Sequence, residues 1–113
     1  MKFLMLICVD EANQPTPEEA ERHRAGAFAW ADEMGGRKVR LQGSALQPVR
    51  EAKTVRARHG QVLIADGPFA ETKEQIAGFD ILECSDIDEA VEAASKHPMA
   101  QSGSIEVRQF YQP

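Results

Sequence analysis

The sequence predicts an α+β fold in which two helices cover one face of a mainly antiparallel sheet. Three observations support this class. Short apolar runs typical of strands recur along the chain, two segments with capping residues and helical spacing interrupt them, and the resulting order is β, α, two to three β, then β, α, β. The length of 113 residues fits one domain, which we expect to span residues 1–113.

The first strand and the first helix have separate signals. Residues 2–9 are continuously apolar, as in a strand covered on at least one face. Thr16 fits an N-cap, and Glu19 three residues later completes a capping box. The helix is predicted to end near Met34, where a Gly-Gly pair follows. Its inner face, at three- and four-residue spacing, would consist of Ala20, His23, Ala27, Trp30 and Met34.

The middle of the chain predicts a bent strand and a hairpin. Residues 38–48 alternate at first and then bend at Gly43. Residues 53–58 alternate again, and a tight turn at Gly60-Gln61 leads into a strand at 62–65.

A second strand–helix–strand unit ends the chain. Residues 77–85 form an apolar strand, and Asp86 fits the N-cap of a helix that ends at Pro98. Residues 104–110 alternate and predict the last strand. Together these elements predict a ferredoxin-like arrangement.

Composition limits the classes of function. A net charge of −5 argues against a nucleic-acid-binding protein, and no apolar run is long enough to cross a membrane. We expect a cytoplasmic protein in which Cys8 and Cys84 are free buried thiols, with no metal site and no cofactor. A local basic run favours a solvated strand face over an anion-binding face; it consists of Arg50, Lys53, Arg56 and Arg58.

One long motif carries a family resemblance. Residues 66–83, "DGPFAETKEQIAGFDILE", resemble the signature of the DGPF-type branch of the YCII-related proteins. Residues 43–48, 86–98 and 103–110 extend the resemblance over nearly the whole chain. The resemblance implies a ferredoxin-like subunit that forms a homodimer with the two sheets facing each other, as in the dimeric α/β-barrel superfamily.

The resemblance also implies candidates for the site. Some YCII-like proteins are thought to use a His–Asp pair on small molecules, a few act as dehydrochlorinase-type lyases, and some DGPF-type sequences are associated with sigma-factor systems. His23, on the first helix, is the positional candidate for the histidine, and Asp66 is the candidate partner. Each has a structural alternative: Asp66 as an Asx-turn, and His23 as a packed core histidine.

The segment after Asp66 is the predicted ligand-binding rim. Its candidates are Phe69, Glu71, Thr72 and Lys73. Lys73 suits a carboxylate or phosphate of a ligand, or a surface ion pair with a neighbouring glutamate. An apolar pocket wall or simple core packing would be formed by Phe28, Trp30, Phe69 and Phe79. His59 and His97 are interpreted as structural, and the positive form of His97 would suit the dipole at a helix C-terminus.

Two functions therefore remain open. One is a small-molecule enzyme in which His23 and Asp66 act on a small organic acid. The other is a non-catalytic ligand-binding or regulatory dimer that uses the same pocket. A relative that keeps only the fold is a third alternative.

Overall fold

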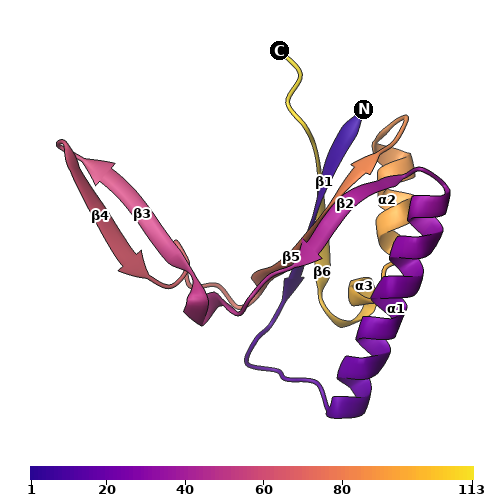
Figure 1. Ribbon diagram of the computed structural model, residues 1–113, viewed down its shortest axis with the longest axis horizontal. Coiled ribbons are helices and arrows are strands. Elements are labelled where there is room, and N and C mark those ends of the chain that lie inside the picture. Colours follow the sequence, from indigo (N-terminus) through magenta and orange to yellow (C-terminus); the bar gives the residue numbers. More distant parts are fainter.

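A four-stranded antiparallel sheet, with helices on one face, forms the centre of the computed structural model, which describes residues 1–113 (Figure 1). The strand order is β2-β5-β1-β6, and a second, two-stranded sheet pairs β3 with β4. This order confirms the predicted α+β, ferredoxin-like fold. The elements in chain order are β1 (Lys2–Val9), α1 (Pro17–Gly36), β2 (Arg40–Ala45), a 3-10 turn η1 (Val49–Glu51), β3 (Lys53–Arg58), β4 (Gln61–Asp66), β5 (Gln75–Glu83), α2 (Ile87–Ser95), α3 (Met99–Ser102) and β6 (Ser104–Gln109).

The core lies between the sheet and the helices. Strand register places Phe3 opposite Leu82 and Met5 opposite Val107, so these side chains project to the same face of the sheet. Phe3, Met5 and Leu82 are fully buried there, and α1 contributes Trp30 and Met34. We call the sheet β2-β5-β1-β6 with its three helices the body.

Helix α1 begins as predicted and ends later than predicted. Thr16 Oγ1 accepts a hydrogen bond from the Glu19 N–H, and the Glu19 carboxylate accepts one from the Thr16 N–H, which completes the capping box. The Gly-Gly pair does not end the helix, because both glycines keep helical geometry and Arg37 is the C-cap. The left-handed residue is instead Lys38, with φ of 61°.

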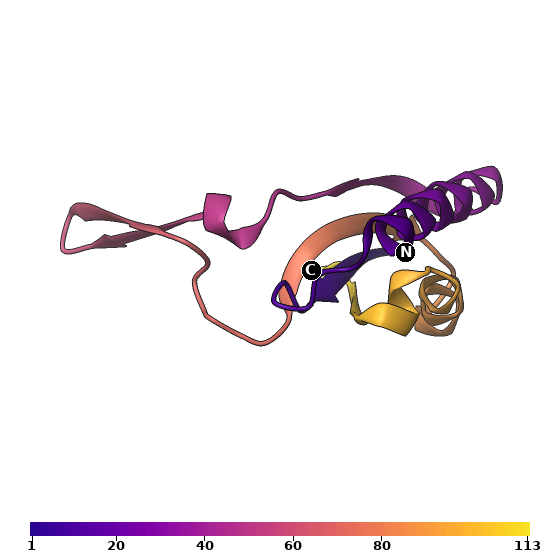
Figure 2. The ribbon, with the colours of Figure 1, turned by 90° about the horizontal axis from the view of Figure 1, so that it is seen from below.

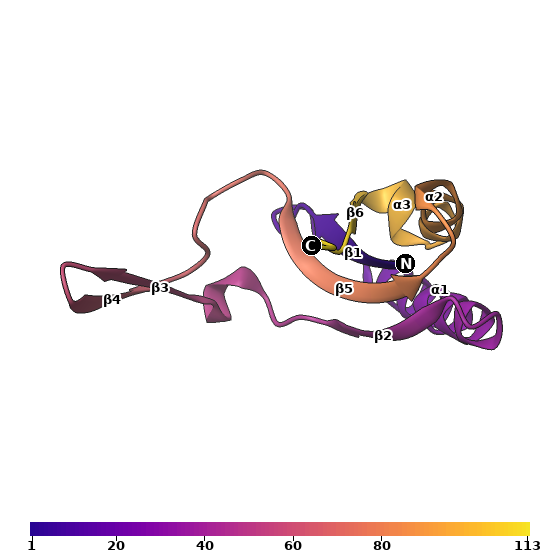
Figure 3. The ribbon, with the colours of Figure 1, turned by 90° about the horizontal axis from the view of Figure 1, so that it is seen from above.

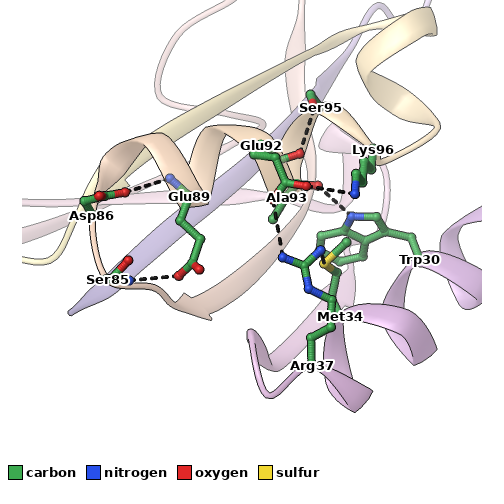
Figure 4. A network of polar contacts seen from close by, with 10 residues as sticks. All are labelled: Trp30, Met34, Arg37, Ser85, Asp86, Glu89, Glu92, Ala93, Ser95 and Lys96. Atoms are coloured by element: carbon green, nitrogen blue, oxygen red, sulfur yellow. Dashed lines mark hydrogen bonds and ion pairs between the residues drawn. The ribbon is translucent and has the colours of Figure 1, made fainter.

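Polar contacts join α1 to α2 at the far end of the core (Figure 4). The Trp30 indole Nε1–H donates to the Ala93 carbonyl at 2.8 Å, and Arg37 contacts the Glu92 carboxylate at 3.3 Å. Asp86 caps α2 as predicted, accepting from the Glu89 N–H at 2.9 Å. These contacts hold α1 over the sheet.

Strands β3 and β4, together called the arm, project away from the body (Figures 1 to 3). The predicted hairpin is confirmed, but its turn is His59-Gly60, with φ of 52° and 75°, one residue earlier than expected. Two consecutive positive φ values are the geometry of a type I′ turn, which matches the twist of a hairpin. Every residue of the arm except Thr54 is exposed.

The second face of the central sheet carries no helix. Leu4 and Leu6 alternate with the core residues of β1, and they lie opposite Ile81 and Phe79 of β5. All four are half-buried side chains on the side of the sheet that faces away from α1 and α2. We call this surface the open face.

None of the helices is both long and apolar enough to cross a membrane.

Candidate functional site

A cavity of about 600 Å³ lies between α1 and the helix-facing side of the sheet, and we call it the main cavity. Apolar side chains form much of its wall, including Phe28, Trp30 and Ala31 of α1. Its polar lining consists chiefly of His23, Arg24, Arg40, Ser44, Asp80 and His97. An apolar pocket with a few convergent polar groups is the usual form of a small-molecule site.

Asp80 is the carboxylate of the main cavity. It is only 5 % exposed because it occupies a core-facing position of β5, and the Arg40 Nε–H donates to its Oδ1 at 2.7 Å. The opposite residue is Gly43, where a Cβ would lie 1.9 Å from Oδ1. A side chain at position 43 would therefore displace the carboxylate. Burial raises the pKa of Asp80, and the Arg40 hydrogen bond only partly opposes that increase.

His97 is the second buried titratable group of the main cavity. The ring is 4 % exposed and lies edge-on to Trp30, with centroids 4.9 Å apart. Nδ1 accepts the Met99 N–H at 3.1 Å, so the neutral ring carries its proton on Nε2. Burial lowers the pKa of His97. The positive form that would suit the helix dipole is therefore disfavoured, because the ring is buried rather than placed at an exposed helix end.

Each of these two residues keeps a polar atom without a protein partner. Asp80 Oδ2 accepts no hydrogen bond from the chain, and His97 Nε2 donates none. No fully buried side-chain nitrogen or oxygen lacks a partner, so both atoms keep some accessible surface, and both residues line the main cavity. The main cavity thus offers one carboxylate acceptor and one imidazole donor to a molecule inside it.

His23 lies where two cavities meet. It lines the main cavity and a neighbouring one of about 540 Å³, which the β1–α1 loop and η1 also line. Its Nε2 is 3.2 Å from the Ser102 Oγ of α3. The structure thus places His23 at a cavity wall, with a hydroxyl as its hydrogen-bond partner rather than a carboxylate.

Asp66, the predicted partner of His23, lies in the arm. Strand register sets it opposite Lys53, and the two side chains form an ion pair with Asp66 83 % exposed. The predicted His23–Asp66 pair is therefore not formed within one chain, because the hairpin carries Asp66 away from α1 (Figure 1). A contact between them across two chains stays a prediction.

The predicted ligand-binding rim lies outside both cavities. Phe69 is 78 % exposed, and Glu71 and Lys73 are exposed side chains without an ion-pair partner. The Thr72 hydroxyl donates to the Glu74 carbonyl, as a local turn contact. Of the four predicted aromatic residues, Phe28 and Trp30 line the main cavity, whereas Phe79 belongs to the open face.

Asp80 and Arg40 were not among the residues that the sequence predicted for the site, and His97 was interpreted as structural. The signal for Asp80 was present, since a charged residue in "GFDIL" shares its strand face with Leu82, which alternation predicts to be buried. Arg40 had no such signal, because a register shift between Arg40 and Gln42 interrupts the alternation of β2. His97 had no comparable signal, because its burial depends on the packing of Trp30 from a distant helix.

The two cysteines, Cys8 and Cys84, lie outside the lining of the main cavity. Cys84 is buried and Cys8 is half-buried, and both are free thiols. Burial raises the pKa of Cys84 to about 11. No group of three or more His, Cys, Asp or Glu side chains is arranged to hold a metal ion.

Comparisons with known proteins identify the family. The model of the YCII-related domain matches residues 1–112. The chain belongs to the YCII-related family. It is also 45% identical over 65 residues to an uncharacterised protein of Rhizobium meliloti (strain 1021). That alignment covers 56% of this chain and 52% of the relative, so it spans about half the length of the curated protein. The assignment to the DGPF-type branch stays a prediction.

Proposed function

We propose that this YCII-related protein binds a small organic acid in the main cavity and catalyses a proton transfer on it. One observation carries the proposal: Asp80 and His97, each more than nine-tenths buried, line the same cavity with an unused polar atom. Structural networks normally satisfy such atoms, so an unused pair at a cavity wall supports a binding role.

An acidic ligand is favoured by the other polar groups. Arg24, Arg40 and His23 all line the main cavity, and the two terminal nitrogens of Arg40 donate no hydrogen bond to the chain. A carboxylate of the ligand would therefore find donors beside Asp80. The walls formed by Phe28 and Trp30 suit a short apolar portion of the same molecule.

The chemistry follows from the protonation states. A buried carboxylate with a raised pKa is a suitable general base and acid, because its proton affinity is closer to working pH. Asp80 would remove a proton from the carbon next to a carbonyl group. The neutral His97 Nε2–H would donate to the carbonyl oxygen as negative charge develops there. In a lyase-type reaction the resulting carbanion would then expel a leaving group.

The proposal is tested by proton exchange with solvent. The protein is incubated in D₂O with pyruvate, 2-oxoglutarate, oxaloacetate and malate, and deuterium uptake is followed by NMR. We expect catalysed exchange with at least one acid, and a loss of about 10²–10⁴-fold in Asp80→Asn, the usual contribution of a general base. Asp32→Asn is the matched control, because this carboxylate of α1 is exposed and lies outside the lining of the main cavity, so the rate should be unchanged.

The outcomes separate the two functions that the sequence left open. Exchange that survives Asp80→Asn would contradict the assignment of Asp80. An acid that raises the melting temperature in an Asp80-dependent way, and is recovered without deuterium, would favour the non-catalytic binding protein. The sigma-factor association stays a prediction from the resemblance.

We further propose that two copies pair through their open faces. Leu4, Leu6, Phe79 and Ile81 form an apolar surface that the chain itself leaves without a covering layer. A sheet with one apolar face unprotected normally packs on another layer. A second copy offers the same surface, which suits a two-fold interface.

A further inference from the structure

We infer that the arm is a clasp that packs its apolar face on a second copy of this chain. The inference rests on the proposed pairing of open faces and adds a second, separate contact to it. The partner is a second YCII-related chain, and the shape, the face pattern and the charge of the arm support this contact.

The arm has two different faces. Register pairs Val55 with Ile64 and Ala57 with Val62, and these four residues project to one side of the hairpin. Val55, Val62 and Ile64 are 62–67 % exposed in the single chain. The other side is mainly polar, with Arg56 and Arg58 beside Leu63 and Gln61. The arm thus has the residue pattern of a strand pair that packs on another layer through its apolar side only.

Nothing in its own chain supports the arm. An isolated two-stranded hairpin is at best marginally stable in water, because it buries too little apolar surface. The radius of gyration of the chain is 15.8 Å, against about 13 Å expected for a compact domain of this length. The ordered hairpin and the extended shape both indicate a contact that one chain does not supply.

The position of the arm suits a partner on the open face. In Figure 1 the helices lie on one side of the sheet and the arm extends on the other side. The arm and the open face therefore diverge from the segments that join the arm to the body. A copy stacked on the open face would lie within the angle between them. Hydrogen bonds hold the segments that join the arm to the body. The Gly67 N–H donates to the Ala52 carbonyl at 2.8 Å, and the Val49 N–H donates to the Glu11 carboxylate at 3.2 Å.

Charge complementarity favours an identical chain as the occupant. Residues 53–66 carry three cations and one acid, whereas the rest of the chain carries ten cations and seventeen acids. The arm is therefore positive and the body negative. Arg56 and Arg58 project from the polar side of the arm, so the attraction to the body of a second copy acts between regions of opposite net charge and not through ion pairs beneath the apolar side. The same contact is made twice in a two-fold dimer.

The test measures association and arm protection in the full chain. Sedimentation equilibrium gives the dimer dissociation constant of the wild type, of Ile64→Asp and of Leu63→Asp. Positions 63 and 64 are adjacent and exposed, but they lie on opposite faces of the arm. We expect Ile64→Asp to weaken the dimer at least about tenfold and Leu63→Asp to change it less than about threefold. Equal effects of the two substitutions would overturn the inference.

Hydrogen exchange of the arm amides distinguishes the clasp from the sheet pairing. We expect amides of residues 53–66 to be protected at high protein concentration and to lose protection on dilution and in Phe79→Asp, an open-face variant. A dimer with unprotected arm amides would overturn the clasp and leave the sheet pairing standing. A wild type that is monomeric at every concentration would overturn both. Concentration-independent protection in a monomer would place the arm on its own chain and also overturn the clasp.

Discussion

The body and the arm are both formed from alternating strands, yet they owe their structure to different sources. The body buries Phe3, Met5 and Leu82 completely beneath two helices. The arm buries almost nothing, and its residues are shaped by a type I′ turn and by cross-strand pairs. Alternation alone therefore does not specify a covered strand. It specifies two faces, and whether one of them is covered depends on what the rest of the assembly provides.

Removing the same side chain from each region gives the largest expected contrast. Leu82→Ala opens a cavity in the body and should lower the free energy of unfolding by about 2–5 kcal/mol. Leu63→Ala removes a half-exposed side chain from the polar side of the arm and should cost less than about 0.5 kcal/mol. Urea unfolding at one fixed protein concentration, followed by the fluorescence of the single tryptophan Trp30, measures both. Similar losses would show that the arm is part of the core.

Glycine substitutions distinguish a position that lacks space for a side chain from a position whose backbone conformation disfavours one. A Cβ at Gly43 would lie 1.9 Å from Asp80 Oδ1 and 2.6 Å from the Phe79 carbonyl oxygen, so Gly43→Ala should cost about 1–3 kcal/mol in the body. Gly60 has open space but a φ of 75°, so Gly60→Ala should cost the arm about 1–2 kcal/mol through strain alone.

Asparagine separates the two causes. Gly60→Asn should restore most of the protection of the arm amides, because asparagine tolerates the left-handed region. Gly43→Asn should be more destabilising than Gly43→Ala, because its side chain is larger. Urea unfolding reports the body, and hydrogen exchange reports the arm. Rescue by asparagine at position 43 would contradict the packing explanation.

Much of the fold followed from local signals in the sequence. The capping box at Thr16, the Asp86 cap and the alternating strands each depend on neighbouring residues, and the structure confirms them. The end of α1 was misplaced because Gly35 and Gly36 tolerate helical geometry as well as a cap. The hairpin turn was misplaced by one residue because His59, not Gln61, adopts a positive φ.

The candidate site was predicted less well, for a physical reason. The sequence predicted a strand that ends beside Asp66, and β4 ends at that residue, but local sequence does not state which way a hairpin projects. Asp80, Arg40 and Gly43 meet only because β2 and β5 pair in one register, although forty residues separate Arg40 from Asp80. Such a site depends on long-range pairing, and a motif search along the chain favours residues that are adjacent in sequence.

The smallest expected effect is a pH dependence that belongs to the body and not to the arm. Burial lowers the pKa of His97, so the folded chain holds the neutral ring where the unfolded chain, with an ordinary pKa near 6.5, accepts a proton. The unfolded state then binds more protons, and the free energy of unfolding falls as the pH drops from about 7 through 6.5 toward the lowered value.

His97→Asn should flatten this slope, since asparagine can still accept the Met99 N–H, whereas His59→Asn in the exposed turn should keep the wild-type slope. Melting temperatures of the three proteins between pH 7.5 and 5.5 measure the difference. The raised pKa of Asp80 changes the free energy of unfolding in the opposite direction, and this contribution is common to all three proteins. An equal slope in His97→Asn and wild type would place the titrating group elsewhere.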